Sequence, residues 1–169
     1  MIGHGKASLS IQGGNLCLIQ EPVNVLEVIE HTVDDLKMDQ RKGIELTMHF
    51  PSQDHPPMIV GDRESLKKVF TNILLNAIQS RPNGEGCIEI AVGANHPGQV
   101  VATIRDTGCV IGPERLKHIF NPCWTTKAYG MGIGLYHTRS IVRRHGGQMR
   151  IYSQPNRRTT VELELPPII

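Results

Sequence analysis

The sequence predicts an α+β fold, a two-layer sandwich in which a mixed, mostly antiparallel sheet is covered by helices on one face. Three observations predict it. Strand-like segments occur in pairs, stretches with apolar residues at helical spacing lie between the pairs, and 169 residues suffice for one buried core but not for two ordinary ones. We expect residues 22–169 to form this domain and residues 1–21 to be a linker, with a short edge strand at residues 16–19.

The first predicted helix begins after Asn24, which is a favourable N-cap. Glu27 follows at the third helical position and completes a capping box. Apolar residues recur at helical spacing to about Met38, and Gly43 ends the element. Residues 44–50 then alternate between apolar and polar side chains, which predicts a half-buried strand.

A second long helix is predicted after a loop at residues 51–57 and a short strand at residues 58–60. Asp62 can cap this helix, which should end near Ser80. Its apolar stripe has the 3.6-residue period of an α-helix and consists of Leu66, Val69, Phe70, Ile73, Leu74 and Ala77.

The second half of the chain is predicted to form a strand hairpin, a short helix, a long helix and a second hairpin. The hairpin strands are expected at residues 87–94 with 99–105 and at residues 148–153 with 160–165. A proline can start the short helix at residues 113–119, and the long helix should span residues 134–145 before the stop signal Gly146-Gly147. Residues 121–132 lack periodicity, and because such a segment is uncommon unless functional, we interpret it as a lid.

The composition excludes several classes of protein. A net charge of +2 gives no support for a nucleic-acid partner, and no apolar run approaches the roughly 18 residues of a membrane span. Four cysteines are scattered without CxxC spacing, so we expect reduced cysteines of a cytosolic protein and no zinc site.

Two asparagines interrupt the second predicted helix. Asn72 and Asn76 stand four residues apart and therefore share one face. Each lowers helix propensity by roughly half a kcal/mol relative to alanine. Either they are ordinary exposed or internally bonded side chains, or their amide oxygens face a hydrated Mg²⁺, which prefers oxygen ligands.

Two further segments allow an ordinary and a functional interpretation. Asp106 follows an apolar strand and is either a turn former or a buried acceptor for an exocyclic amine such as that of adenine, with Gly108 allowing the ring to approach closely. Gly130, Gly132 and Gly134 alternate before a helix, a pattern that favours backbone N–H groups around an anion. Their spacing is neither that of the dinucleotide fingerprint nor that of the P-loop.

The segment before these glycines carries aromatic, hydroxyl and ammonium groups. Phe120 and Trp124 either anchor a mobile lid by burying large apolar area or are simple core aromatics. Thr125, Thr126 and Lys127 could reach phosphates when the lid closes. Judged in isolation, Lys127 is equally consistent with a solvated surface charge.

Together and in this order, these segments resemble the four motif boxes of the catalytic domain of sensor histidine kinases, within the wider superfamily of gyrase, chaperone and mismatch-repair ATPases. Asn72 and Asn76 resemble the asparagine box, and residues 106–111 resemble the first glycine box. Residues 120–127 resemble the phenylalanine box and residues 130–135 the second glycine box. The likeness covers nearly the whole domain and is similar to the nitrogen-regulatory and oxygen-sensing branches.

The resemblance implies ATP and Mg²⁺ as cofactors and gives residues their roles. Asn76 would be the Mg²⁺ ligand, Asp106 would accept the adenine amine, and Thr159 would support that contact through water. The catalytic residues would be Asn72, Asn76 and Lys127. The set implied for the nucleotide is Asn72, Asn76, Gln79, Asp106, Gly108, Ile111, Phe120, Thr125, Thr126, Lys127, Gly130, Met131, Gly132, Ile133, Gly134, Leu135 and Thr159.

The implied activity is transfer of the γ-phosphoryl group of ATP to a histidine on separate dimerisation helices, with a response regulator downstream in two-component signalling. ATP-hydrolysing relatives carry a glutamate general base at the position of Asn72, and an amide cannot take a proton, so the domain alone should hydrolyse ATP poorly. None of the eight histidines has the sequence context of a phospho-acceptor, which we expect upstream. The domain is expected to be cytoplasmic and monomeric, without membrane or nucleic-acid contact.

Departures from the family pattern leave alternatives open. Val110 and Cys109 stand where the family usually has glycine and proline. A β-branched residue cannot adopt positive φ cheaply, so we expect restricted hinge motion at the start of the lid. Gln79 replaces a residue that is often basic. The alternatives are a non-catalytic nucleotide-binding regulatory module and an ATPase of the gyrase or chaperone type.

Overall fold

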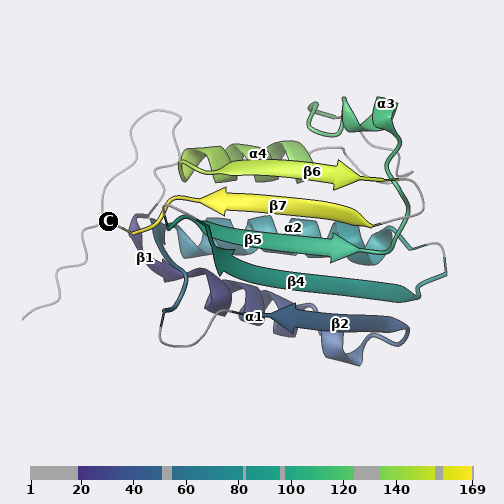
Figure 1. Ribbon diagram of the computed structural model, residues 1–169, viewed down its shortest axis with the longest axis horizontal. Helices are drawn as coiled ribbons and strands as arrows, with labels where there is room; N and C mark the ends of the chain where they lie inside the picture. Colours follow the sequence, from purple (N-terminus) through teal and green to yellow (C-terminus); the bar gives the residue numbers. More distant parts are fainter. Residues whose placement is uncertain are drawn as a thin grey trace, which may run out of the picture.

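Two layers make up the fold, as Figure 1 shows for the computed structural model. A five-stranded sheet lies in front, and the helices α1 (Val25–Asp35), α2 (Arg63–Gln79) and α4 (Gly134–Arg144) lie behind it. The structure describes residues 19–50, 55–81, 83–95, 98–123, 134–154 and 158–168. Within these ranges no helix covers the front of the sheet, so the predicted two-layer α+β class with helices on one face is confirmed.

The sheet has the strand order β2-β4-β5-β7-β6. The strands are β2 (Ile44–His49), β4 (Gly86–Ala94), β5 (Val100–Asp106), β7 (Thr159–Leu165) and β6 (Gln148–Ser153). β2 runs parallel to β4, and the other neighbouring pairs are antiparallel. Both predicted hairpins, β4 with β5 and β6 with β7, are present, and the sheet is mixed and mostly antiparallel as predicted.

The core lies between the sheet and the helices. Alternate residues of β5 and β7 are buried, so each strand turns one apolar face toward the helices and the other face toward solvent. The stripe predicted for the second helix is buried at every position, namely at Leu66, Val69, Phe70, Ile73, Leu74 and Ala77. This packing fixes the rotation of α2 and therefore the direction in which its remaining side chains point.

A separate two-stranded antiparallel sheet joins the start of the domain to the segment before α2. It consists of β1 (Glu21–Asn24) and β3 (Met58–Gly61). The edge strand expected at residues 16–19 is not found at Ile19, which lies outside any strand, and the rest of it lies outside the described residues. The strand that forms instead contains Pro22, which is tolerated because both strands of a two-stranded sheet are edges.

Two helices end earlier than predicted. α1 ends at Asp35 rather than near Met38, because Lys37 adopts a left-handed conformation with φ of 50° that interrupts the helix. A 3₁₀-helix, η1 (Met38–Gln40), follows, and through it Met38 is still buried in the core. The helix predicted at residues 113–119 is shorter as well, since α3 spans Pro113–Leu116.

Both predicted N-caps are present. Asn24 Oδ1 accepts a hydrogen bond from the backbone N–H of Leu26 (3.1 Å), and Asp62 Oδ1 accepts one from the backbone N–H of Ser65 (2.9 Å). The capping box differs from expectation, because Glu27 accepts from the side-chain amide of Asn24 (3.4 Å).

A buried histidine ties the end of α4 to the start of α2. His145 Nε2 accepts a hydrogen bond from the backbone N–H of Asp62 (3.0 Å), and Nδ1 lies 2.9 Å from the backbone oxygen of Ile141. Since Nε2 is an acceptor, Nδ1 carries the proton and donates to Ile141. Gly61 leaves room for the ring, because a Cβ there would lie 2.6 Å from His145 Cδ2. The two helices that flank the candidate site are thereby joined at one end.

Gly147, just after α4, is expected to tolerate no side chain. A Cβ there would lie 2.4 Å from the backbone oxygen of Glu164 and 3.0 Å from Cδ2 of Leu165. We expect Gly147→Ala to lower the free energy of unfolding by roughly 2–3 kcal/mol in urea denaturation. Gly93→Ala is the matched control, because a Cβ at that position in β4 meets nothing within 4 Å. A comparable loss in the control would contradict the steric explanation.

Candidate functional site

One stripe of α2 carries the polar side chains around which the candidate site is built. Asn72, Asn76 and Ser80, which caps the helix, follow at intervals of four residues and therefore lie on one face. With a rise of 1.5 Å per residue, Asn72 and Ser80 are about 12 Å apart along the helix axis. The α2 stripe, as we call these three residues, contacts the end of β5 through Ser80 and the first turns of α4 through Asn72.

Asp106 is the last residue of β5, and only 6% of its surface is exposed. Its Oδ1 accepts hydrogen bonds from the backbone N–H of Gly108 (2.9 Å) and from the hydroxyl of Ser80 (3.1 Å). Gly108 has no room for a side chain, because a Cβ there would lie 1.9 Å from Ser80 Oγ. The carboxylate is thus buried and held through Oδ1, which leaves Oδ2 as the acceptor available to a ligand.

The surroundings of Asp106 act on its pKa in both directions. Burial, the largest effect, raises the pKa of Asp106 above its usual range. The Gly108 N–H, the Ser80 hydroxyl and the positive charge of Arg81 oppose this rise by favouring the ionised form. A buried carboxylate that is supplied with donors on one oxygen suits the recognition of an amine by the other oxygen.

Thr159 and Ile111 lie at the same end of the sheet. Thr159 on β7 is the register partner of Asp106 and is buried. Its Oγ1 lies 3.0 Å from Oγ of Ser153, which also accepts a hydrogen bond from the backbone N–H of Ile111 (2.9 Å). The loop after β5 is therefore tied to both β6 and β7, and this holds it beside the Asp106 carboxylate.

The other end of the α2 stripe meets the start of α4. Asn72 Nδ2 donates a hydrogen bond to Thr138 Oγ1 (3.2 Å), and Thr138 Oγ1 donates one to the backbone oxygen of Gly134 (2.7 Å). Leu135 packs against the hydrophobic core. Asn72 therefore lies next to the first turns of α4, where a helix start favours an anion.

The amides of the α2 stripe are the groups that suit a metal ion here. Because Nδ2 of Asn72 donates to Thr138, Oδ1 is the atom of this amide that suits a metal ion. Asn76 lies on the same face between Asn72 and Ser80. Amide oxygens together with phosphate and water fit Mg²⁺, which keeps several waters when bound. In the part of the chain that the structure describes, no group of three or more His, Cys, Asp and Glu side chains could hold a metal ion.

Other predicted residues are more peripheral or lie outside the description. Phe120 lies against α4, with the guanidinium carbon of Arg139 4.5 Å from its ring centre. Gln79 is exposed at the end of α2, and Val110 has no positive φ, so the valine is unstrained in this conformation. The predicted residues outside the described ranges are Trp124, Thr125, Thr126, Lys127, Gly130, Met131, Gly132 and Ile133.

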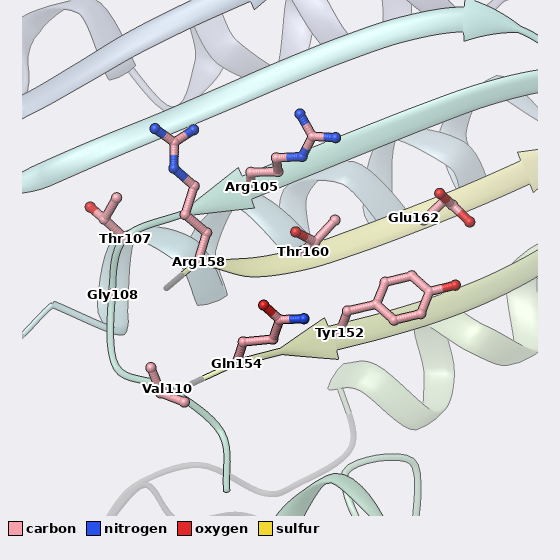
Figure 2. A pocket seen from close by; sticks show the side chains of 9 residues that line it. All are labelled: Arg105, Thr107, Gly108, Val110, Tyr152, Gln154, Arg158, Thr160 and Glu162. Carbon is pink, nitrogen blue, oxygen red and sulfur yellow. The ribbon is translucent and has the colours of Figure 1, made fainter. Parts of the chain in front are cut away.

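A hollow of about 910 Å³ lies on the opposite, uncovered face of the sheet, as Figure 2 shows. It is lined by Arg105, Thr107, Gly108, Val110, Tyr152, Gln154, Arg158, Thr160 and Glu162. Successive strand residues point to opposite faces, so Arg105 lies in this hollow while Asp106 points toward the helices. Of the residues that line the hollow, Gly108 belongs to the predicted ligand-binding set. Its backbone N–H also donates to Asp106.

The charged side chains of this hollow form ion pairs with side chains outside its lining. Arg105 and Arg158 both bond to Glu89, at 3.0 Å and 2.6 Å. Glu162 bonds to Arg150 at 3.1 Å. Each charged side chain of the hollow thus has an ion-pair partner, although the two arginines share one carboxylate. The hollow includes neither the α2 stripe nor Asp106, and we take these as the candidate site.

Sequence reasoning missed Ser80, Arg81 and Thr138. A signal existed for two of them, because Ser80 follows Asn76 by four residues and Thr138 follows Gly134 by four, which places each on the face already singled out. Arg81 is only 7% exposed. Arginine is rarely buried unless it is paired, and no pattern in the neighbouring sequence predicts its burial here.

Residues 61–169 match the family described as histidine kinase-, DNA gyrase B-, and HSP90-like ATPase. The matched region is more than half of the chain and contains α2, β5 and α4, which carry the candidate site. The chain belongs to this family. The resemblance inferred from the motif boxes is thereby confirmed, and relatives in sequence and structure are histidine kinases.

The chain is 33% identical over 149 residues to sensor histidine kinase ZraS of Escherichia coli (strain K12), which covers 88% of this chain and 31% of the relative. It thus spans about a third of the length of the curated relative. No helix of this ATPase domain, in the described ranges, is both long and apolar enough to cross a membrane.

Solved histidine kinase structures share the fold. The catalytic domain of histidine kinase ThkA, in a nucleotide-free form, superimposes with a TM-score of 0.77 at 26% identity, covering 88% of this chain and 96% of that chain. ThkA in complex with response regulator protein TrrA superimposes with a TM-score of 0.74 at 26% identity, covering 89% of this chain and 42% of that chain. The fold of the chain is that of histidine kinase catalytic domains.

Proposed function

We propose that this chain is the catalytic domain of a sensor histidine kinase, which binds ATP with Mg²⁺ and transfers the γ-phosphoryl group to a histidine on separate dimerisation helices. The observation that carries the proposal is the α2 stripe, which has a buried carboxylate at its Ser80 end and the start of α4 at its Asn72 end. A separation of about 12 Å along the helix suits a nucleotide that places its base at one end and its phosphates at the other.

In this proposal each end of the stripe has a defined task. Asp106 accepts the exocyclic amine of adenine, with Thr159 beside it in the sheet. Asn76 offers its amide oxygen to Mg²⁺, and Asn72 orients the surrounding water. A bound metal ion would supply positive charge that neutralises the phosphates. Lys127 is proposed to meet the phosphates.

The side chain at position 72 favours transfer over hydrolysis. An amide cannot accept a proton from water, so Asn72 cannot act as a general base. Its bond to Thr138 fixes its orientation, which suits a positioning role. Catalysis would then rest on aligning ATP with the accepting histidine and on neutralising charge in the transition state.

The phospho-accepting histidine is proposed to lie on another segment of the parent protein. His145, for example, is buried with both ring nitrogens in hydrogen bonds, so it is not accessible to a phosphoryl group. A response regulator has been seen bound to ThkA, and we propose a response regulator as the downstream partner here. Because ATP is the phosphoryl donor, we propose that the domain works in the cytoplasm.

A two-stage measurement tests the proposal. Calorimetric titration of the purified chain is expected to show ATP binding that strengthens with Mg²⁺. Labelled ATP is then mixed with the chain and the dimerisation-helix fragment of the parent kinase, and label is expected on the fragment's histidine. Binding of ATP without transfer of label would indicate a regulatory nucleotide-binding module. Rapid release of phosphate in the absence of the fragment would indicate an ATPase. Absence of ATP binding would contradict the proposal.

Thr138→Val is expected to weaken Mg²⁺-dependent ATP binding about three- to tenfold. Valine keeps the shape of threonine but leaves the Asn72 amide without its acceptor, so Asn72 loses its fixed orientation. Thr32→Val is the matched control, because Thr32 is also buried in a helix and donates its hydroxyl to a backbone oxygen, that of Val28 (2.7 Å), outside the site. Equal losses of affinity in the two variants would show that Thr138 acts through stability alone.

A further inference from the structure

The Ser80 hydroxyl has two acceptors for its single hydrogen. Ser80 Oγ lies 2.9 Å from the backbone oxygen of Ala77 and 3.1 Å from Oδ1 of Asp106. A hydroxyl has one hydrogen to donate and lone pairs with which to accept. When Asp106 is ionised, donation to its carboxylate is favoured, because charge-assisted bonds are roughly twice as strong as neutral ones. When Asp106 is protonated, Ser80 can donate to Ala77 and accept from the carboxyl group instead.

The contact between Ser80 and Asp106 is supported by the backbone on both sides. The N–H of Cys109 donates to the backbone oxygen of Ser80 (2.7 Å), so the turn after β5 is fixed to the end of α2. Gly108 N–H holds Oδ1 from the other side. Since a Cβ at Gly108 would overlap Ser80 Oγ, the absence of a side chain there is what allows the hydroxyl to reach the carboxylate.

Arg81 supplies a buried positive charge behind the same turn. Its Nη2 donates to the backbone oxygen of Cys87 (3.1 Å), while Nε and Nη1 are buried without a hydrogen-bond partner in the described structure. A Cβ at Gly86 would lie 2.9 Å from Nε of Arg81 and 2.6 Å from Oγ1 of Thr107. The guanidinium group of Arg81 and the turn after β5 therefore lie on either side of this glycine. Arg81 therefore helps to keep the Asp106 carboxylate ionised despite burial.

We propose that Ser80 is a positioning residue for adenine recognition: with the Gly108 N–H, its hydroxyl holds Oδ1 of Asp106 and so leaves Oδ2 directed to the purine amine. The inference rests on the proposed function, because it assigns Ser80 to the base end of the ATP site. It also gives Ser80 a second effect, since a donor to Oδ1 favours the charged carboxylate to which an amine binds more strongly.

The expected pH dependence follows from the groups around Asp106. Its sheet neighbours Ile88 on β4 and Thr159 on β7 do not titrate, and the chain at the end of α2 contributes the cap residue Ser80 and the cation Arg81. Burial raises the pKa of Asp106, and the bond from Ser80 lowers it, so removing the hydroxyl raises this pKa further. ATP affinity is lost as the pH falls through the folded-state pKa, and the loss begins at a higher pH when Ser80 is alanine.

Ser80→Ala tests the proposal through base selectivity. ATP affinity near neutral pH is expected to fall about three- to tenfold. The triphosphate of purine riboside, which lacks the 6-amino group, is expected to bind the variant as well as it binds the wild type. Ser65→Ala is the matched control, because Ser65 also lies beside a carboxylate, that of Asp62, to which its backbone N–H donates at the opposite end of α2 (2.9 Å). Equal losses for both nucleotides in Ser80→Ala would overturn the proposal, because they would indicate a merely structural role.

A second readout separates this proposal from the proposed function. The pKa of Asp106, followed by the ¹³C shift of its carboxyl carbon in the nucleotide-free protein, is expected to be higher in Ser80→Ala and unchanged in Ser65→Ala. If the wild type binds ATP while neither this pKa nor the base selectivity changes, the Ser80 proposal fails alone. If the wild type binds no ATP, the proposed function fails, and the assignment of Ser80 to adenine fails with it.

Discussion

Replacing Asn76 with alanine is expected to abolish the Mg²⁺-dependent part of ATP binding and to slow phosphotransfer on the order of a thousandfold. Asn76 lies at the middle of the α2 stripe, with Asn72 and Ser80 one helical turn away on either side. Asn72 is bonded to Thr138 and Ser80 to Asp106, so neither is free to move into its place. Calorimetric titration and single-turnover transfer to the accepting histidine measure the two effects.

Chelation of the metal provides the control for this variant. In the wild type, EDTA is expected to weaken ATP binding, whereas in Asn76→Ala the affinity should be the same with Mg²⁺ and with EDTA. Alanine is the better helix former by roughly half a kcal/mol, so thermal melting should show an intact fold. A variant that keeps the Mg²⁺ response of the wild type would remove Asn76 from the metal site.

Asp106→Asn is expected to weaken ATP binding about 10- to 100-fold, the cost of losing a charged hydrogen bond. The amide can still accept at Oδ1 from Gly108 and Ser80, but it presents an N–H donor where the adenine amine also donates. GTP, with an acceptor at that ring position, should lose less affinity or gain. Competition binding with ATP and GTP measures the ratio, and an unchanged ratio would show that Asp106 does not contact the base.

The same substitution should affect stability in the opposite sense. Burial raises the folded-state pKa of Asp106 above its unfolded value, so the folded protein holds the proton more tightly. The resulting stabilisation is present at low pH and is lost as the pH rises through the folded-state pKa, where an ionised carboxylate must stay buried. Asp106→Asn is therefore expected to unfold at the same or higher urea concentration than the wild type at neutral pH, with the difference shrinking toward acid. If Asp106→Asn is less stable than the wild type at neutral pH, and this deficit disappears in acid, the predicted pH dependence of stability is contradicted.

Elements with local signals could be predicted from the sequence, and elements made by distant pairing could not. Asn24 and Asp62 mark helix starts through their own side chains, and α2 shows its period directly. β1 has only four residues, one of which is a proline, and it forms a strand because β3 pairs with it. The end of α1 was misplaced because Met38 continues the apolar pattern, although it reaches the core from a 3₁₀-helix.

The candidate site divides in the same way. Asn72, Asn76 and Asp106 could be chosen from the sequence, because each is a polar residue within or at the end of an apolar element. Their partners could not be chosen, since Asp106 and Ser80 are 26 residues apart in the chain, and Asn72 and Thr138 are 66 apart. Only the packing of α2 between β5 and α4 brings these pairs within hydrogen-bond distance.

Because both ends of the site belong to one helix, the span between them is a property of the backbone. The loop after β5 and α4 belong to other segments of the chain, so displacing either of them would leave the length of α2 unchanged. If the site binds ATP as proposed, the length of α2 sets which nucleotides reach both ends, and side-chain changes do not alter that length. Changes in which base is accepted and changes in how many phosphates are required can therefore evolve independently.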